Sequence, residues 1–151
     1  MRIFIDADAC PVKDETLKVA ERYQIPVSIV SNGGMRPSRD PLVSTIVVSA
    51  GADIADDWIA DEAGTGDIVI TADIPLAARI LEKQAHPLGP TGRLFTEETI
   101  GMALAMRQLK QDVRESTQTQ TRNRSFQARD RSNFLQALDR LVIMERKKAK
   151  G

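Results

Sequence analysis

Four short apolar runs alternate with longer amphipathic segments, and this alternation restricts the fold more than any other feature of the chain. The runs are rich in β-branched residues and cover 3–5, 27–30, 44–48 and 67–71. Strands that are apolar on both faces are typical of parallel sheets covered by helices on each side. The sequence therefore predicts an α/β fold: a three-layer α/β/α sandwich of the Rossmann-like class, with a mainly parallel central sheet and helices at the C-terminus.

Segments with helical spacing separate and follow these runs. Helices are expected over 12–24, 52–63 and 74–84, then from about 96 to 114 and from about 130 onward. The Pro- and Gly-rich stretch 87–92 is expected to be a loop. The predicted organisation is an α/β domain over 1–115, a polar linker or mobile loop over 116–128, and a C-terminal helix over 129–151 that packs on the same domain.

Composition excludes several classes of protein. With 151 residues, of which 42% are hydrophobic, the chain can form one domain with a sizeable core. Cys10 is the only cysteine, which excludes an internal disulfide and a thiolate zinc cluster and fits a reducing cytoplasm. Asp6 interrupts the first apolar run, and no later run approaches the ~18 residues of a membrane span. We expect a soluble, cytoplasmic protein without a membrane partner.

The net charge of zero conceals a polarity along the chain. Residues 1–100 carry 9 Lys and Arg against 16 Asp and Glu, whereas residues 101–151 carry 12 against 5. An acidic body with a basic tail could hold a cation in one part and contact a polyanion with the other. A solvated helix rich in Lys and Arg is the alternative explanation of the tail.

Acidic residues follow two of the predicted strands. Asp6 and Asp8 come after the first strand, and Asp73 comes after the fourth. The carboxyl ends of parallel strands share one edge of a sheet, where such folds bind ligands. If the first and fourth strands are neighbours, Asp6 and Asp73 lie within one or two strand spacings of ~4.8 Å. Helix capping is the alternative for Asp8, because Pro11 opens the next helix.

The predicted helix 52–63 contributes further carboxylates. Asp56 borders the apolar face of this helix, and Asp53 lies one turn away on the same flank. Asp57 and Asp61 point away from that face and are expected to be solvated. Asp56 is therefore the preferred helix residue of an acidic site, with Asp53 as a further candidate.

Oxygen ligands without clustered histidines or thiolates favour a hard cation, Mg²⁺ or Mn²⁺, over zinc. Such a cation binds phosphate oxygens and activates water, so phosphoryl transfer is the expected chemistry. Thr71 could orient a ligand or a water beside the acids, although a Thr in a strand is also explained by β-propensity. The expected metal ligands are Asp6, Asp8, Asp53, Asp56 and Asp73, and the expected catalytic residues are Asp6, Asp8, Asp56 and Asp73.

The segments IFIDADACP, GADIADDWIA and GDIVITADIPLA resemble the YaiI/YqxD family of bacterial proteins, a relative of the PIN-like nucleases. The resemblance spans most of residues 1–85 and touches the segment that begins at Asp130. It implies a PIN-like fold whose acidic cluster holds Mg²⁺ or Mn²⁺ and hydrolyses phosphodiesters of RNA or DNA. By position, the acids of that cluster fall on Asp6, Asp56 and Asp73, and Asp8 is an addition of the narrower family. A further acid of many PIN domains has no counterpart here unless Asp53 replaces it.

Basic residues are candidate contacts to a nucleic acid, with RNA as the expected partner. Arg36 and Arg39 follow the second predicted strand, on the same sheet edge as Asp6, and Arg122, Arg124 and Arg131 lie in or near the linker. Ordinary solvation is the alternative for each. The function expected from these residues is that of a metal-dependent nuclease, which is a hydrolase. The sequence leaves open whether the protein is catalytically active.

Two other functions fit parts of the pattern. Asp6-Ala7-Asp8 also resembles the opening of haloacid-dehalogenase-type phosphatases, in which the first Asp is a nucleophile and the second a general acid. A non-catalytic module could use a structural cation in the acidic pocket and the basic tail to bind RNA or a protein.

Cys10 is expected to pack, rather than act as an activated thiol. Trp58 lies off the packed face of its helix, which leaves self-association into a homo-oligomer open.

Overall fold

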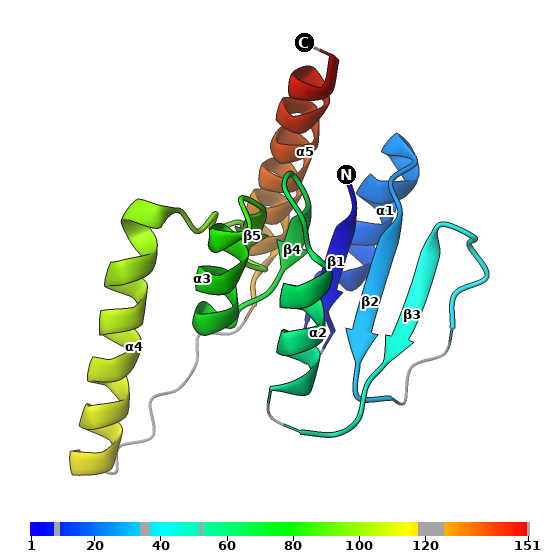
Figure 1. The fold of residues 1–151 in the computed structure, drawn as a ribbon. Helices are drawn as coiled ribbons and strands as arrows, with labels where there is room; N and C mark the ends of the chain where they lie inside the picture. The colour runs from blue at the N-terminus through cyan, green and yellow to red at the C-terminus, as the bar shows by residue number, and fades with distance from the viewer. Residues whose placement is uncertain (8–9, 34–36, 52, 118–125, 151) are drawn as a thin grey trace.

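The computed structural model describes residues 1–7, 10–33, 37–51, 53–117 and 126–150. Within these residues, five parallel strands form one sheet in the order β3-β2-β1-β4-β5 (Figure 1). The strands are β1 (Ile3–Asp6), β2 (Val27–Ser31), β3 (Val43–Val47), β4 (Ile68–Ile70) and β5 (His86–Leu88). The predicted α/β fold with a parallel central sheet is confirmed.

Helices cover both faces of this sheet. They are α1 (Lys13–Tyr23), α2 (Ile54–Glu62), α3 (Ile74–Glu82), α4 (Glu97–Thr117) and α5 (Ala128–Lys150). Buried side chains of α1 and α5 pack in one core with β1, β2 and β4, and those of α2 and α3 pack in a second core on the opposite face. The three predicted layers are therefore present, and α4 lies against α3 at one side (Figure 1).

The alternation of side chains along β1 determines where the next residue points. Ile3 and Ile5 are fully buried in the core under α1 and α5, whereas Phe4 is fully buried in the core under α2 and α3. Successive side chains of a strand point to opposite faces. Asp6 therefore lies on the same face as Phe4, toward α2 and α3, which carry the other predicted acids.

The prediction of a loop over 87–92 is wrong at its start, and β5 was missed. His86, Pro87 and Leu88 pair with β4 as an edge strand, and a turn follows. A proline is tolerated on an edge strand because one side of that strand needs no ladder hydrogen bonds. A run of three residues containing Pro carries too little periodicity to be recognised as a strand.

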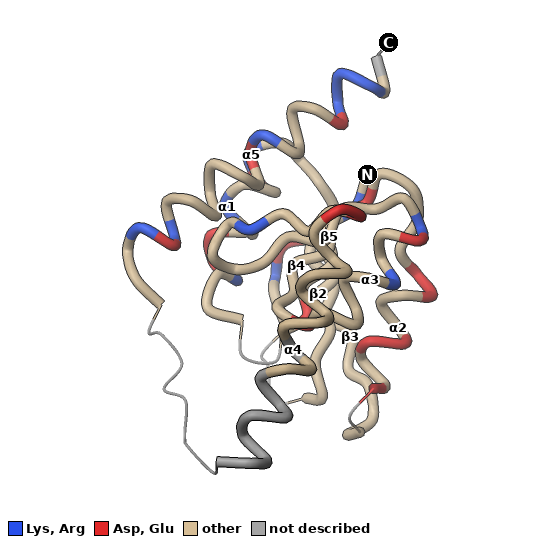
Figure 2. Tube along the Cα trace, turned by 90° about the vertical axis from the view of Figure 1, so that its left-hand side faces the viewer, with Lys and Arg blue, Asp and Glu red and all other residues tan. Residues whose placement is uncertain are grey.

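The C-terminal helix packs on the body of the molecule. Phe134, Leu138, Leu141 and Val142 of α5 are buried in the core that also contains β1 and α1. Most of the predicted linker lies outside the described residues. Basic residues recur along α5, and acidic residues recur along α2 (Figure 2). No helix in the described part of the chain is long and apolar enough to cross a membrane.

Candidate metal centre

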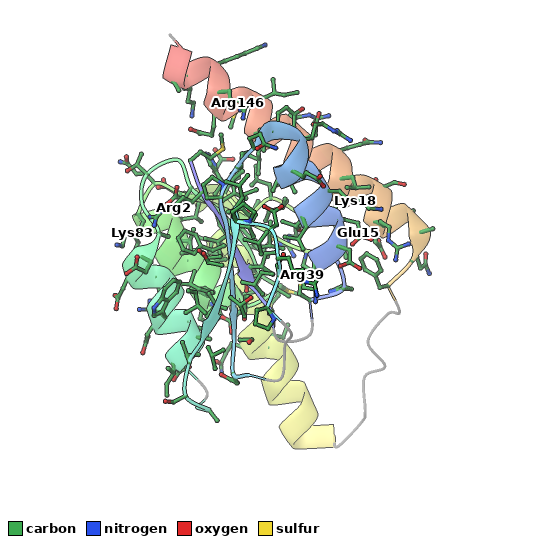
Figure 3. All side chains as sticks on the ribbon, turned by 90° about the vertical axis from the view of Figure 1, so that its right-hand side faces the viewer. Arg2, Glu15, Lys18, Arg39, Lys83 and Arg146 are labelled. Carbon is green, nitrogen blue, oxygen red and sulfur yellow. The ribbon has the colours of Figure 1, made fainter. Side chains whose placement is uncertain are left out.

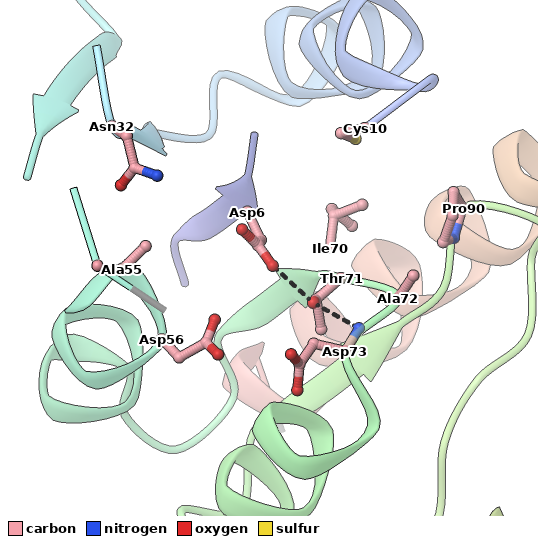
Figure 4. A pocket seen from close by; sticks show the side chains of 11 residues that line it. Asp6, Cys10, Asn32, Ala55, Asp56, Ile70, Thr71, Ala72, Asp73 and Pro90 are labelled. Carbon is pink, nitrogen blue, oxygen red and sulfur yellow. Dashed lines mark hydrogen bonds between the residues drawn. The ribbon is translucent and has the colours of Figure 1, made fainter. Parts of the chain in front are cut away.

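A cavity of about 600 Å³ lies at the carboxyl edge of the sheet. Its walls come from the residues that follow β1, β2 and β4, from the start of α2 and from the loop after β5 (Figure 4). We call it the acidic cavity; it is lined by Asp6, Cys10, Asn32, Gly51, Ala55, Asp56, Ile70, Thr71, Ala72, Asp73 and Pro90. None of these described lining residues is Lys, Arg or His. Among the described residues, the cavity thus presents three carboxylates and no cationic side chain.

The pairing of β1 with β4 brings Asp6 and Thr71 side by side. Ile5 pairs with Ile70, so the next residue of each chain segment reaches the same edge of the sheet. The buried Thr71 hydroxyl donates a hydrogen bond to Asp6 Oδ2 at 3.0 Å. Thr71 Oγ1 in turn accepts a hydrogen bond from the backbone N–H of Asp73 at 3.0 Å. The first and fourth strands are thus neighbours, which is the condition on which the approach of Asp6 and Asp73 depended, and Thr71 links these two acids.

Asp73 is the N-cap of α3. Its Oδ1 accepts a hydrogen bond from the backbone N–H of Leu76 at 2.9 Å, and Pro75 stands in the first turn, where a missing N–H costs nothing. Its other carboxylate oxygen makes no hydrogen bond within the described residues. Figure 4 shows the Asp73 carboxylate facing Asp6 and Asp56 across the cavity. Capping therefore accounts for one oxygen of this side chain.

Asp56 and its neighbour Asp57 lie in different environments. Asp56 follows the buried Ala55 and faces the acidic cavity, whereas Asp57 points outward and accepts a hydrogen bond from Arg79 Nη1 at 2.7 Å. Burial, together with the negative charges of Asp73, Asp6 and Asp53, raises the pKa of Asp56 from 3.8 to about 6. The cavity therefore disfavours a third negative charge in the absence of a cation.

Cys10 lines the acidic cavity beside the carboxylates. Burial raises the pKa of the Cys10 thiol, and the negative charges of Asp6 and Glu15 raise it further. A hydrogen bond from the Val12 backbone lowers the pKa but does not cancel these effects. A thiol with a raised pKa remains protonated and is neither a good nucleophile nor a good metal ligand. This agrees with the preference for a hard cation rather than zinc.

The remaining predicted site residues are distributed more widely. Asp53 occupies the N-cap position of α2 without a capping hydrogen bond and is exposed outside the cavity lining. Arg39 is exposed beside the start of β3 and does not line the cavity (Figure 3). Arg131 forms an ion pair with Glu15 at 2.9 Å. The other predicted residues, Asp8, Arg36, Arg122 and Arg124, lie outside the described residues.

Sequence reasoning missed several residues of the lining, among them Asn32 and Pro90. Asn32 follows β2, so the rule that strand ends carry ligands, applied to every strand, would have found it. Pro90 follows β5, and its position became apparent only with that strand. Both additions come from the same edge of the sheet as Asp6 and Asp73.

The oxygen atoms of the acidic cavity are of the kind that binds a hard divalent cation. Carboxylate and hydroxyl oxygens suit Mg²⁺ and Mn²⁺, which keep several water ligands and need only one or two protein carboxylates. In the part of the chain that the structure describes, no three His, Cys, Asp or Glu side chains form a ready-made metal-binding group. A cation held here would therefore be bound partly through water.

Comparison with known proteins places the chain among bacterial relatives. The model of the YaiI/YqxD family, described as uncharacterised, matches residues 4–144. A UPF0178 protein of Mesorhizobium japonicum is 61% identical over 140 residues, which cover 93% of this chain and 90% of the relative. A UPF0178 protein of Parvibaculum lavamentivorans is 59% identical over 93% of this chain and 92% of its own length. A UPF0178 protein of Agrobacterium fabrum is 57% identical over 92% of this chain and 91% of its own length. No solved structure is significantly similar to the chain.

Proposed function

Since this chain belongs to the YaiI/YqxD family, we propose that it is a Mg²⁺- or Mn²⁺-dependent phosphodiesterase that hydrolyses nucleic acid, RNA in preference to DNA, at the acidic cavity. The observation that supports this is the convergence of Asp6, Asp56 and Asp73 on one cavity from three different elements. These three residues are the proposed metal ligands. The kinship with PIN-like nucleases is part of the same proposal.

Electrostatics favours a bound cation over a purely structural explanation of the acids. Each carboxylate of the group repels the others, and the raised pKa of Asp56 reflects that repulsion together with burial. A divalent cation would replace the repulsion with attraction and restore the ionised form of Asp56. Capping explains one oxygen of Asp73, but it explains neither Asp6 nor Asp56.

When bound, a cation of this kind polarises the phosphodiester and lowers the pKa of a coordinated water. The protein contributes the orientation of its acids. Thr71 fixes Asp6 through its hydroxyl, and the cap on α3 fixes Asp73 so that its second oxygen faces the cavity. Asp56, on α2, would supply the third carboxylate from the opposite wall of the cavity.

The composition of the cavity lining argues against the phosphatase alternative. Phosphatases that form an aspartyl-phosphate use a basic side chain to neutralise the transferred group, and the described lining contains none. Turnover of a small phosphomonoester without cleavage of RNA would restore that alternative. Binding of Mn²⁺ and RNA without any cleavage would instead indicate a non-catalytic module.

The test compares wild type with Asp6→Asn and with the control Asp57→Asn. Asn keeps an oxygen that can accept the Thr71 hydrogen bond, so the variant retains the local contact while losing its charge. We expect calorimetric Mn²⁺ binding and cleavage of a labelled single-stranded RNA to fall at least ~100-fold in Asp6→Asn, the scale of loss of a metal or oxyanion contact. Asp57→Asn, outside the cavity, should retain both. Equal cleavage by Asp6→Asn and wild type would refute the proposed site.

A further inference from the structure

A second cavity, of about 360 Å³, lies between the turn after β5 and the outer face of α5. We call it the arginine cavity; it is lined by Thr91, Gly92, Arg93, Asn133, Gln136, Ala137 and Arg140. The described residues of this lining offer two guanidinium groups, two amides and a hydroxyl, and none of them carries a carboxylate. These are donors typical of a site for a phosphate group, which arginine binds through paired N–H groups.

The two arginines of this cavity differ from several other arginines in the fold. Arg22, Arg79 and Arg131 each form an ion pair with an Asp or Glu. Arg93 stacks on the Phe95 ring at 5.2 Å, and neither Arg93 nor Arg140 forms an ion pair with any described carboxylate. Both side chains are exposed to solvent, and two guanidinium groups that share one cavity can bind an anion between them through their N–H groups.

The turn that lines the arginine cavity also borders the acidic cavity. Pro90 belongs to the acidic lining, and the next residues, Thr91 to Arg93, belong to the arginine lining. Backbone hydrogen bonds close this turn, from Gly89 N to Arg93 O at 2.8 Å and from Gly92 N to Gly89 O at 3.0 Å. A short hydrogen-bonded segment therefore separates the two cavities.

Close packing fixes this turn against α5. Gly92 has a φ of +91°, and a Cβ at this position would lie 2.7 Å from the backbone carbonyl of Asn133. Only glycine fits a left-handed conformation at such a close approach. The packing ties the position of Arg93 to that of α5, which carries Arg140, so the two guanidinium groups are supported by an ordered part of the fold.

From these contacts we infer that the arginine cavity binds a phosphate group of the same strand whose scissile bond occupies the acidic cavity. The substrate is then an oligonucleotide rather than a mononucleotide or a small phosphate ester. This inference rests on the proposed function. The acidic cavity repels a phosphate until a cation is bound, and the arginine cavity supplies the attraction that holds a polyanion at its border.

The first test is binding of a fluorescein-labelled single-stranded RNA decamer, measured by fluorescence anisotropy in EDTA so that no cleavage occurs. The double variant Arg93→Gln/Arg140→Gln is compared with Lys18→Gln/Lys83→Gln, which removes the same charge from two exposed lysines that line neither cavity (Figure 3). Loss of two phosphate contacts should weaken binding about 25-fold at about 0.1 M salt and reduce the slope of log K against log salt by ~1.4. The lysine variant should change neither quantity by a comparable amount.

The second test separates this inference from the proposed function. With Mn²⁺, the arginine variant should cleave the RNA decamer with a raised KM while hydrolysing bis(p-nitrophenyl) phosphate at the wild-type rate, because that small diester reaches only the acidic cavity. Repeating the binding with a DNA decamer tells whether the site prefers RNA or accepts either strand. Arg93→Lys/Arg140→Lys should recover part of the affinity, since the charges return without the paired N–H geometry.

Each outcome has a distinct meaning. If the arginine and lysine variants bind the decamer equally, the arginine cavity is not a strand contact and the inference is refuted, whatever the catalytic result. If wild type cleaves neither probe but its binding depends on Arg93 and Arg140, the phosphate site stands and the proposed nuclease function fails. Equal KM values for the decamer in wild type and the arginine variant would also refute the inference.

Discussion

Replacement of Asp56 by Asn should stabilise the protein in the absence of a divalent cation, although most substitutions near a cavity destabilise. The Asp56 carboxylate accepts no hydrogen bond from a described residue, so the amide loses no bond that the acid made. The substitution does remove a negative charge that faces Asp6 and Asp73. Its effect on the free energy of unfolding therefore measures the repulsion within the acidic cavity.

The magnitude follows from the pKa. A rise from 3.8 to about 6 corresponds to ~3 kcal/mol if the site were fully shielded from solvent, at about 1.36 kcal/mol for each unit. The side chain is partly exposed and solvent screens its interactions, so we expect about 1 kcal/mol. A carboxyl whose pKa is raised in the folded state costs nothing below its unfolded pKa and costs the full amount above its folded pKa. The advantage of Asp56→Asn should thus be small near pH 4 and complete above pH ~7.

The assay is thermal unfolding at several pH values, with EDTA and with MnCl₂. Asp57→Asn is the control for the loss of helix-dipole stabilisation in the first turn of α2. It also loses the exposed ion pair with Arg79, so the change of the difference with pH, rather than its size alone, reports on Asp56. In EDTA at pH 7.5, Asp56→Asn should exceed Asp57→Asn in Tm by roughly 2–4 °C, the shift that about 1 kcal/mol produces in a domain of this size. MnCl₂ should raise the Tm of wild type and raise that of Asp56→Asn much less.

Two results would refute this reasoning. One is an Asp56→Asn variant that is no more stable than Asp57→Asn at pH 7.5. The other is a stability difference that does not change between pH 4 and pH 7.5, because a difference independent of pH cannot come from the ionisation of Asp56. A normal gain of Tm with MnCl₂ in Asp56→Asn would leave the repulsion intact but remove this residue from the proposed metal ligands.

Three further substitutions test other contacts. Thr71→Val should lower the free energy of unfolding in urea by about 1–3 kcal/mol, since it removes a buried hydroxyl that both donates and accepts a hydrogen bond, whereas Thr71→Ser should retain most of it. Burial raises the pKa of Glu145, but hydrogen bonds from His86 and Lys148 outweigh this effect and lower the pKa below 4.5. Glu145→Gln should therefore lower the free energy of unfolding at pH 7 by up to about 1 kcal/mol. This difference, measured by urea unfolding, should vanish as the pH falls through the lowered pKa. Gly92→Ala should lower Tm through about 1–2 kcal/mol of left-handed strain plus the clash with Asn133, and an unchanged Tm would contradict the close packing of the turn on α5.

Elements with strong periodicity could be predicted from the sequence. The four apolar runs became β1 to β4 because each is β-branched, short and bounded by turn residues. The sequence left open whether β1 and β4 are neighbours, and the pairing of Ile5 with Ile70 shows that they are. β5 could not be recognised, because three residues that include Pro87 are defined as a strand only by their partner β4.

The acidic residues illustrate which parts of a site are local in sequence. Asp6 and Asp73 could be located from the strands that precede them, and Asp56 from the apolar face of its own helix. The nucleic-acid contact expected of Arg39 stays a prediction. Its loop starts at the carboxyl end of β2 and returns to the amino end of β3, a path that the sequence does not reveal. Arg39 precedes Asp40, which bonds to the start of β3, so it lies far along that return.

The arginine cavity could not be predicted at all, because it joins two segments that are remote in sequence. Arg93 follows the unrecognised β5, and Arg140 lies on α5, whose orientation is set by the burial of Phe134 and Leu138. Nothing in the spacing of these residues indicates that they meet. The close approach of Gly92 to Asn133 brings them together, and that contact depends on the finished fold.

The contrast between Asp56 and Asp57 is the strongest argument that the acidic cavity has a function. Both carboxylates stand in the first turn of α2, where a negative charge stabilises a helix. Asp57 gains in addition from an ion pair with Arg79, so selection for stability alone explains it. Asp56 instead faces two more acids, and Asn at this position would stabilise the fold without a cation. A carboxylate that faces two others, at an edge of the sheet where ligands bind, is best explained by what it binds.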